Sequence, residues 1–164
     1  MNENASLFFV DRHVDSHIKE KKAFIEYGSN QKFITYADLH EQSSKLRHFF
    51  SKFKINREDR VIILMQDVIF YPIIFWGCLK SGVVPVLLNT LLSSEVVNDI
   101  INNSRAKAVF ISSGLLSSFE NSVKSNVNIK HIIEVGTKKS SYINFDKEIQ
   151  NCSVQDTIKC SKDE

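Results

Sequence analysis

The chain has 164 residues, about the length of one ordinary domain, and 43% of them are hydrophobic and 24% charged. This composition is typical of a soluble globular protein and excludes a disordered or fibrous chain. The formal net charge of +2 gives no electrostatic reason to expect nucleic acid or an anionic membrane as a partner. The five glycines are too widely spaced for a glycine-rich phosphate loop, which excludes several classes of nucleotide-binding protein.

The three cysteines, Cys78, Cys152 and Cys160, share no C-x-x-C spacing. Their odd number and their spacing predict neither a disulfide framework nor a zinc site. We therefore expect reduced thiols in a cytoplasmic protein. Residues 1–6 lack the basic and apolar regions of a signal peptide, which agrees with that location.

One apolar run, residues 61–79, has about the length of a membrane-spanning helix. Gln66 and Asp67 stand near its middle, and an aspartate at that depth in a bilayer costs at least about 2.5–3.5 kcal/mol. Division of the run at these two residues predicts a buried strand followed by a helix, so we expect no membrane contact.

An amphipathic helix followed by a β-hairpin is predicted for residues 6–34. Apolar residues at helical spacing indicate the helix, with Ser6 as its N-cap. Residues 23–27 and 32–34 then form two short strands around turn residues 28–30. The apolar face of the helix consists of Leu7, Val10, Val14 and Ile18.

A second helix is predicted for residues 36–51. Thr35 and Asp38 have the spacing of a capping box, with aspartate in place of the usual glutamate. The polar segment 52–60 ends this helix.

Apolar strands then alternate with helices over residues 61–135, which predicts a doubly wound, mainly parallel sheet flanked by helices. We therefore divide the α/β chain into an N-terminal helix, hairpin and helix (1–57), a βαβαβαβ region (58–136) and a polar tail (137–164). The tail is interpreted as a linker or a ragged end, with one turn of helix around 145–149. Four strands are predicted: 61–65, which we expect to be covered on both faces, 83–88, which we expect to be buried, 108–111 and 131–135.

The first helix of the sheet region is predicted to start with Asp67 as its N-cap and to end at Ser81. Gly82 follows at the position where a left-handed glycine ends many helices, and Pro72 lies near the first turn. The two later helices are predicted to start at Ser93 or Ser94 and after residues 112–114.

Two residue pairs in the first predicted helix have the spacing of a site. His13 and His17 stand at i and i+4, but the sequence H-V-D-S-H lacks the glutamate of a metalloprotease motif. Asp11 and Asp15 have the same spacing. We interpret both pairs as solvated residues of a helix surface rather than as a metal site or a catalytic carboxylate pair.

No phosphate-binding or nucleophilic motif is present. The turn at 65–67 lacks G-x-G-x-x-G, and the chain contains neither a Walker sequence nor a G-x-S-x-G elbow. Ser112, Ser113 and Gly114 would offer hydroxyl and N–H groups to an anion, but we expect an ordinary helix cap. From the residues alone we expect no catalytic, cofactor-binding or metal-binding residue.

Several runs together resemble the AMP-forming acyl-CoA synthetases and related adenylate-forming enzymes. Ile34–Leu39 resembles the Leu-Thr-Tyr-x-Glu-Leu motif of that family, and Leu79–Val86 resembles its Leu-Lys-Ala-Gly motif that ends in proline. Asp38 in place of glutamate and Ser81 in place of alanine are mild departures, and the resemblance covers about residues 4–135. Four further runs resemble the benzoate-CoA ligase branch, which activates aromatic carboxylates: 10–14, 58–61, 85–92 and 103–108.

The resemblance implies an incomplete N-terminal domain of an adenylate-forming enzyme. In that family a carboxylate attacks the α-phosphate of ATP with the help of Mg²⁺, and coenzyme A then displaces AMP. The phosphate loop, the adenine site and the C-terminal lysine domain are not among residues 1–164, so the resemblance transfers no site residue. It implies a fragment that is inactive and needs no cofactor alone, with ATP, Mg²⁺, coenzyme A and a small carboxylate as ligands of a full-length relative.

Two other functions remain open. One is a non-catalytic remnant that self-associates or docks on a partner chain, because apolar stripes such as that of the first helix would otherwise be partly exposed. The other is an unrelated flavodoxin-like binder, which predicts tight binding of a flavin or a nucleotide.

Overall fold

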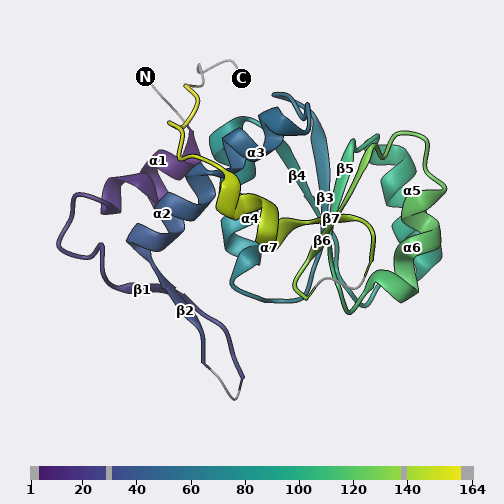
Figure 1. The fold of residues 1–164 in the computed structure, drawn as a ribbon, viewed down its shortest axis with the longest axis horizontal. Coiled ribbons are helices and arrows are strands. Elements are labelled where there is room, and N and C mark those ends of the chain that lie inside the picture. Colours follow the sequence, from purple (N-terminus) through teal and green to yellow (C-terminus); the bar gives the residue numbers. More distant parts are fainter. Residues whose placement is uncertain (1–3, 29–30, 138–139, 160–164) are drawn as a thin grey trace.

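The structure, a computed structural model, describes residues 4–28, 31–137 and 140–159. Its centre is a five-stranded parallel sheet with the order β4-β3-β5-β6-β7, and helices cover both faces (Figure 1). This arrangement confirms the predicted α/β, doubly wound fold. The strands are β3 (Arg60–Leu64), β4 (Val84–Leu87), β5 (Ala108–Ser112), β6 (His131–Val135) and β7 (Ile143–Asn144).

Successive residues of β3 point to opposite faces, which explains why this strand is a continuous apolar run. Val61 and Ile63 belong to the core under one layer of helices, and Ile62 and Leu64 belong to the core under the other. All four side chains are fully buried. The first layer contains α3 (Leu46–Lys52), α4 (Phe70–Ser81) and α7 (Phe145–Glu148), and the second contains α5 (Ser94–Ser104) and α6 (Leu116–Lys124).

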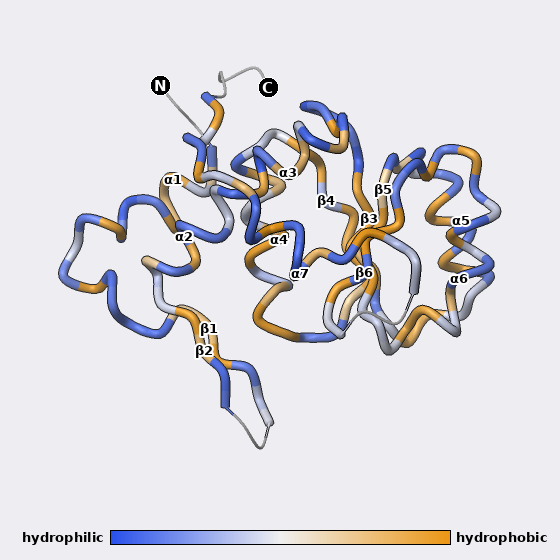
Figure 2. The backbone as a smooth tube through the Cα atoms, in the orientation of Figure 1, coloured by the Kyte–Doolittle hydropathy of each residue, from blue (hydrophilic) through white to orange (hydrophobic). Residues whose placement is uncertain are grey.

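Hydropathy follows the same division. Figure 2 shows hydrophobic residues concentrated along the central strands, with hydrophobic and hydrophilic residues alternating along α5 and α6. A second hydrophobic stretch lies in the predicted hairpin, which β1 (Lys22–Ile25) and β2 (Phe33–Thr35) form away from the sheet. Phe24 and Phe33 of this hairpin are 43% and 48% exposed, so apolar surface also lies outside the two cores.

The N-terminal segment differs from the single helix predicted for it. Asn4, rather than Ser6, is the N-cap of a short helix, and its side-chain oxygen accepts the Ser6 N–H at 3.0 Å. The chain then bends at Val10, whose side chain is fully buried, and the bend directs Asp11 toward α4. The prediction of one long helix is wrong because tertiary packing at these two positions outweighs the helical spacing. The observed elements are α1 (Ala5–Phe9) and a 3₁₀ turn at Asp11–His13.

The predicted capping box at Thr35 and Asp38 is confirmed. The Asp38 N–H donates to Thr35 Oγ1 at 3.1 Å, and the Thr35 N–H donates to Asp38 Oδ2 at 2.9 Å. The helix that begins there, α2 (Tyr36–Ser44), is interrupted at Lys45. The single helix predicted for 36–51 is therefore two helices, α2 and α3.

α4 begins later than predicted, and Asp67 does not cap it. Instead, the Ile69 N–H donates to the carboxylate of Glu26 at 3.0 Å, so the hairpin supplies the cap. Pro72 lies in the first turn, as predicted. Gly82 follows the last turn in the left-handed conformation, with φ of 67°, which is also as predicted.

Two predictions at the margins of the sheet are wrong. β4 is an edge strand rather than the buried strand predicted for 83–88, and Val84 and Leu87 are 38% and 47% exposed. The interpretation of the tail as a linker fails for residues 143–158, because β7 pairs with β6 and Phe145 is fully buried. The turn of helix predicted near 145–149 is present as α7.

Within the described ranges, no helix is long and apolar enough to cross a membrane. The apolar run 61–79 divides into β3 and α4, as predicted.

Candidate functional site

The strand order places a crevice at the carboxyl ends of β3 and β5. From β3 the chain crosses to β4 on one side, and after β4 it returns to β5 on the other side of β3. Open parallel sheets bind ligands in the crevice at such a reversal. A cavity of about 490 Å³ opens there. Its polar lining residues include Glu26, Lys32, Gln66, Ser112, Ser113 and Asp146.

The serines of this crevice are hydrogen-bonded within the protein. Ser112 Oγ accepts the N–H of Gln66 at 3.0 Å, and Ser113 Oγ donates to the carbonyl of Val135 at 3.0 Å. These bonds join the carboxyl ends of β3, β5 and β6. α6 begins after Leu115 without a side-chain cap, so the prediction that the serines cap it is wrong.

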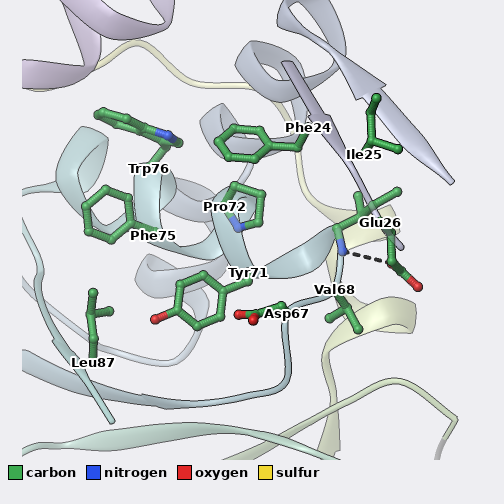
Figure 3. Close-up of a pocket in the computed structure, with 11 residues that line it drawn as sticks. Phe24, Ile25, Glu26, Asp67, Val68, Tyr71, Pro72, Phe75, Trp76 and Leu87 are labelled. Carbon is green, nitrogen blue, oxygen red and sulfur yellow. Dashed lines mark hydrogen bonds between the residues drawn. The ribbon is translucent and has the colours of Figure 1, made fainter. Parts of the chain in front are cut away.

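An apolar groove lies beside the crevice, between the hairpin and the first turns of α4 (Figure 3). Its volume of about 510 Å³ is in the range of small-molecule sites. Glu26 and Asp67 contribute its carboxylates. Burial raises the pKa of Tyr71 in its wall, and the Asp67 carboxylate raises that pKa further. The apolar lining consists of Phe24, Ile25, Val68, Ile69, Pro72, Phe75, Trp76 and Leu87.

Glu26 links the hairpin to α4, and its removal is expected to loosen the groove. Glu26→Ala should lower the free energy of unfolding by about 1 kcal/mol, because the start of α4 loses both an acceptor and a favourable negative charge. Glu26→Gln, which keeps the acceptor, should cost about half as much. Urea denaturation measures both losses. Exposed Glu20→Ala is the control, and a loss for Glu26→Ala no larger than the control's would contradict the capping role.

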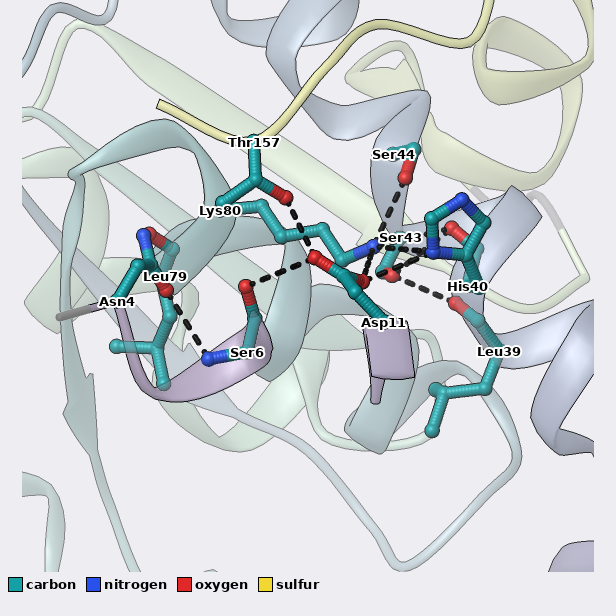
Figure 4. Close-up of polar contacts among 10 residues, drawn as sticks. All are labelled: Asn4, Ser6, Asp11, Leu39, His40, Ser43, Ser44, Leu79, Lys80 and Thr157. Carbon is teal, nitrogen blue, oxygen red and sulfur yellow. Dashed lines mark hydrogen bonds and ion pairs between the residues drawn. The ribbon is translucent and has the colours of Figure 1, made fainter. Parts of the chain in front are cut away.

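A buried ionic cluster lies at the opposite end of α4 (Figure 4). Lys80 is 1% exposed, and its ammonium group lies 2.5 Å from Asp11 Oδ1 and donates to Ser44 Oγ at 2.9 Å. His40 Nδ1 lies 2.9 Å from the same carboxylate oxygen. Thr157 Oγ1 donates to the other oxygen, Oδ2, at 2.8 Å. The prediction that Asp11 is a solvated surface residue is therefore wrong.

The protonation of Asp11 couples this cluster to pH. Burial raises the pKa of Asp11, but hydrogen bonds from His40 and Lys80 and the charge of Lys80 outweigh burial and lower the pKa from 3.8 to about 2. Because the unfolded chain takes up this proton at a higher pH, the stabilisation is complete above about pH 4 and is lost as the pH falls to 2. We expect a loss of about 1–2 kcal/mol, reduced from the full shift by solvent screening. Denaturant titrations between pH 4 and pH 2 measure this loss of unfolding free energy. Asp11→Asn should remove the part of the pH dependence that comes from Asp11.

The structure does not bring His13 and His17 together on one helix. The His13 ring packs against Tyr36, with ring centroids 4.6 Å apart, and its Nε2 accepts a hydrogen bond from Arg12. In the part of the chain that the structure describes, no group of three or more histidine, cysteine, aspartate or glutamate residues is arranged to hold a metal ion.

The roles of Glu26 and Lys80 were missed from the sequence. Lys80 carries a usable signal, because it is the one charged residue in the otherwise apolar sequence of α4, and a lysine in such a helix needs an anionic partner. Glu26 has no local signal, because the residue that it caps, Ile69, is 43 positions away.

The profile of a protein family described as AMP-binding enzyme matches residues 10–162. A 4-hydroxybenzoate–CoA/benzoate–CoA ligase of Rhodopseudomonas palustris is 32% identical over 133 residues, which are 81% of this chain and 24% of that protein. A long-chain-fatty-acid–CoA ligase of Haemophilus influenzae is 30% identical over 142 residues, which are 86% of this chain and 24% of that protein. The chain thus spans about a quarter of the length of these relatives.

Two solved structures share the fold. A benzoate CoA ligase from Burkholderia xenovorans matches 98% of this chain over 31% of its own, with a TM-score of 0.84 and 22% identity. An anthranilate CoA ligase in complex with anthranoyl-AMP matches 99% of this chain over 30% of its own, with a TM-score of 0.87 and 17% identity.

Proposed function

Because the chain belongs to the AMP-binding enzyme family, we propose that it is the N-terminal part of an AMP-forming ligase that joins an aromatic carboxylate to coenzyme A. The observation that carries the proposal is the 32% identity to a ligase named for 4-hydroxybenzoate and benzoate. Two structural neighbours named for benzoate and anthranilate support the same substrate class. The interpretation as an unrelated flavodoxin-like binder is wrong, because the family profile spans residues 10–162.

We further propose that the chain alone does not form an acyl-adenylate. It spans about a quarter of its relatives, and the family resemblance implies ATP, Mg²⁺ and coenzyme A as ligands of a full-length enzyme. The two crevice serines do not fit Mg–ATP by themselves, because Ser113 donates its hydroxyl proton to the carbonyl of Val135 and only the hydroxyl proton of Ser112, whose oxygen accepts the Gln66 N–H, is left for a phosphate. We therefore assign no step of the reaction to a residue of this chain.

ATP–pyrophosphate exchange tests this inactivity. The purified chain is incubated with Mg–ATP, labelled pyrophosphate and benzoate, 4-hydroxybenzoate or anthranilate. We expect no exchange above a protein-free blank, with the full-length Rhodopseudomonas ligase as the positive control. Carboxylate-dependent exchange by the 164-residue chain alone would overturn the proposal.

The coding sequence after codon 164 tests whether the chain is part of a larger ligase. We expect a frame that encodes a loop similar to Tyr-Thr-Ser-Gly-Thr-Thr-Gly, which is the phosphate loop that the resemblance implies. Absence of such a loop from every downstream frame would contradict this part of the proposal.

A second candidate function is a docking module, and the exposed apolar side chains favour it. Phe8 and Phe9 are 56% and 55% exposed, and Ile25 and Leu87 are 54% and 47% exposed. Apolar surface of this kind commonly marks an interface. Two measurements test it: light scattering gives the oligomeric state, and fluorescence of a hydrophobic dye reports exposed apolar surface. A dilute monomer that binds no dye would count against docking and self-association.

We also propose a cytoplasmic location. Cys78 and Cys152 are free thiols, and burial raises the pKa of Cys78 far above its usual value. Unpaired cysteines are typical of reducing compartments. Cys160 lies outside the described residues.

A further inference from the structure

Residues 153–158, which we call the C-terminal strap, lie extended across the C-terminal ends of α2 and α4. The Gln155 N–H donates to the carbonyl of Ser44 at 3.2 Å, and the Ile158 N–H donates to the carbonyl of Lys80 at 2.9 Å. Carbonyls in the last turn of a helix have no partner within that helix. The strap therefore supplies one N–H donor to a terminal carbonyl of each of two helices that are distant from it in sequence.

The N-terminal segment meets α4 at the same end. The Asn4 side chain donates to the carbonyl of Leu79 at 2.7 Å, one residue before the carbonyl that the strap occupies. In Figure 1 the last described residues of the chain, in yellow, accordingly pass beside α1. The end of α4 is thus capped jointly by both ends of the described chain.

The strap is held mainly by polar contacts outside the two cores, together with the side chain of Ile158, which lies against Gly82 at the end of α4. Arg47 Nη1 donates to the carbonyl of Asp156 at 2.8 Å, and the Ser153 N–H donates to His48 Nδ1 at 2.9 Å. None of the residues 153–158 is buried. A segment with little buried apolar surface and exposed hydrogen bonds opens at low free energy while the rest of the fold stays closed.

Asp11 joins the strap to the N-terminal segment. Its Oδ2 accepts the hydrogen bond of Thr157, while its Oδ1 binds Lys80 and His40 (Figure 4). The Asp11 carboxylate thus contacts the strap, α2 and α4. The burial of the preceding residue, Val10, holds Asp11 in this position. Release of Thr157 leaves Asp11 with Lys80 and with a longer hydrogen bond from Ser6 Oγ to Oδ2 at 3.5 Å, but removes the shorter of these two hydrogen bonds to Oδ2.

We propose that the C-terminal strap is a detachable latch whose opening is coupled through Asp11 to loosening of the N-terminal segment, residues 4–13. The two segments open together while the sheet remains folded. α4 is about 18 Å long, and its first turns line the apolar groove while its last turn contacts the strap. α4 therefore connects the strap to that groove, and an effect of strap opening on activity rests on the proposed function.

Hydrogen exchange followed by mass spectrometry tests the coupling on the 164-residue chain. Thr157→Val keeps the shape of the side chain and removes its hydroxyl. We expect exchange to rise about tenfold in peptides from the strap and severalfold in peptides from residues 4–13, because a hydrogen bond to a charged group is lost. Peptides from β5 should exchange as in the wild type. Thr157→Ser, which keeps the hydroxyl, is the matched control.

The reciprocal variant completes the test. Asn4→Ala, which weakens the N-terminal contact with α4, should raise exchange in the strap, because coupling between two sites acts in both directions. A rise confined to the altered segment in either variant would overturn the coupling. A rise of the same size in β5 would overturn the proposal as well, because the two segments would then not open while the sheet stays folded. These outcomes do not depend on ATP–pyrophosphate exchange, so failure of the latch and failure of the proposed function are distinguishable.

Discussion

Asp11→Asn is expected to lower the free energy of unfolding by about 3 kcal/mol at neutral pH. The substitution leaves the Lys80 ammonium group, 1% exposed, without its anionic partner, and breaking a buried ion pair from one side costs about 3–5 kcal/mol. We expect the lower end of this range because Ser44 and His40 still contact the ammonium group. Denaturant unfolding followed by circular dichroism measures the loss.

Asp15→Asn is the matched control, because Asp15 lies four residues further along the same segment and is exposed. Its effect should stay within about 0.5 kcal/mol. The double variant Asp11→Asn with Lys80→Met should recover part of the loss, since an apolar side chain of similar size no longer needs a charge partner. If Asp11→Asn and the control Asp15→Asn had equal free energies of unfolding, the buried ion pair would be contradicted.

Phe145→Ala is expected to cost about 3–5 kcal/mol, the typical effect of deleting a buried phenylalanine. The Phe145 side chain is fully buried, and its ring lies 5.5 Å from those of Phe49 and Phe70 and 5.6 Å from that of Phe110, measured between centroids. Removal of the ring would therefore leave a cavity in the middle of the core that lies under α3, α4 and α7. Thermal or urea denaturation measures the change.

Tyr27→Ala controls for loss of an aromatic side chain, because Tyr27 is 99% exposed and should change stability by less than about 0.5 kcal/mol. A loss below about 1 kcal/mol for Phe145→Ala would mean that the segment after residue 136 is a dispensable linker, as its composition alone predicts.

The sheet was predictable from the sequence because its signals are local. β3 is a continuous apolar run, and Gly82 and the Thr35–Asp38 box mark helix ends by their own backbone and side-chain chemistry. The predicted strands correspond to β3, β4, β5 and β6. Regular elements with local start and stop signals can therefore be predicted without knowledge of their neighbours.

The remaining features depend on partners distant in sequence. Whether β4 lies at the centre or at the edge of the sheet depends on where the chain crosses after it, which its own apolar residues do not encode. Asp11 is buried because Lys80 and Thr157 meet it, and Glu26 matters because α4 begins beside it. The polar tail is ordered by a few apolar side chains, because Phe145, Ile149 and Cys152 are buried in the same core. Periodicity and capping rules do not contain these contacts.

The edge position of β4 has a consequence for behaviour in concentrated solution. The N–H groups of Val84 and Leu88 donate to Asp59 and Ile63, so alternate N–H groups between them face away from the sheet. Pro85 occupies one of those outward positions and has no N–H to offer. A second molecule that approaches this edge finds a gap in the row of donors, which disfavours the strand-to-strand stacking that leads to aggregates.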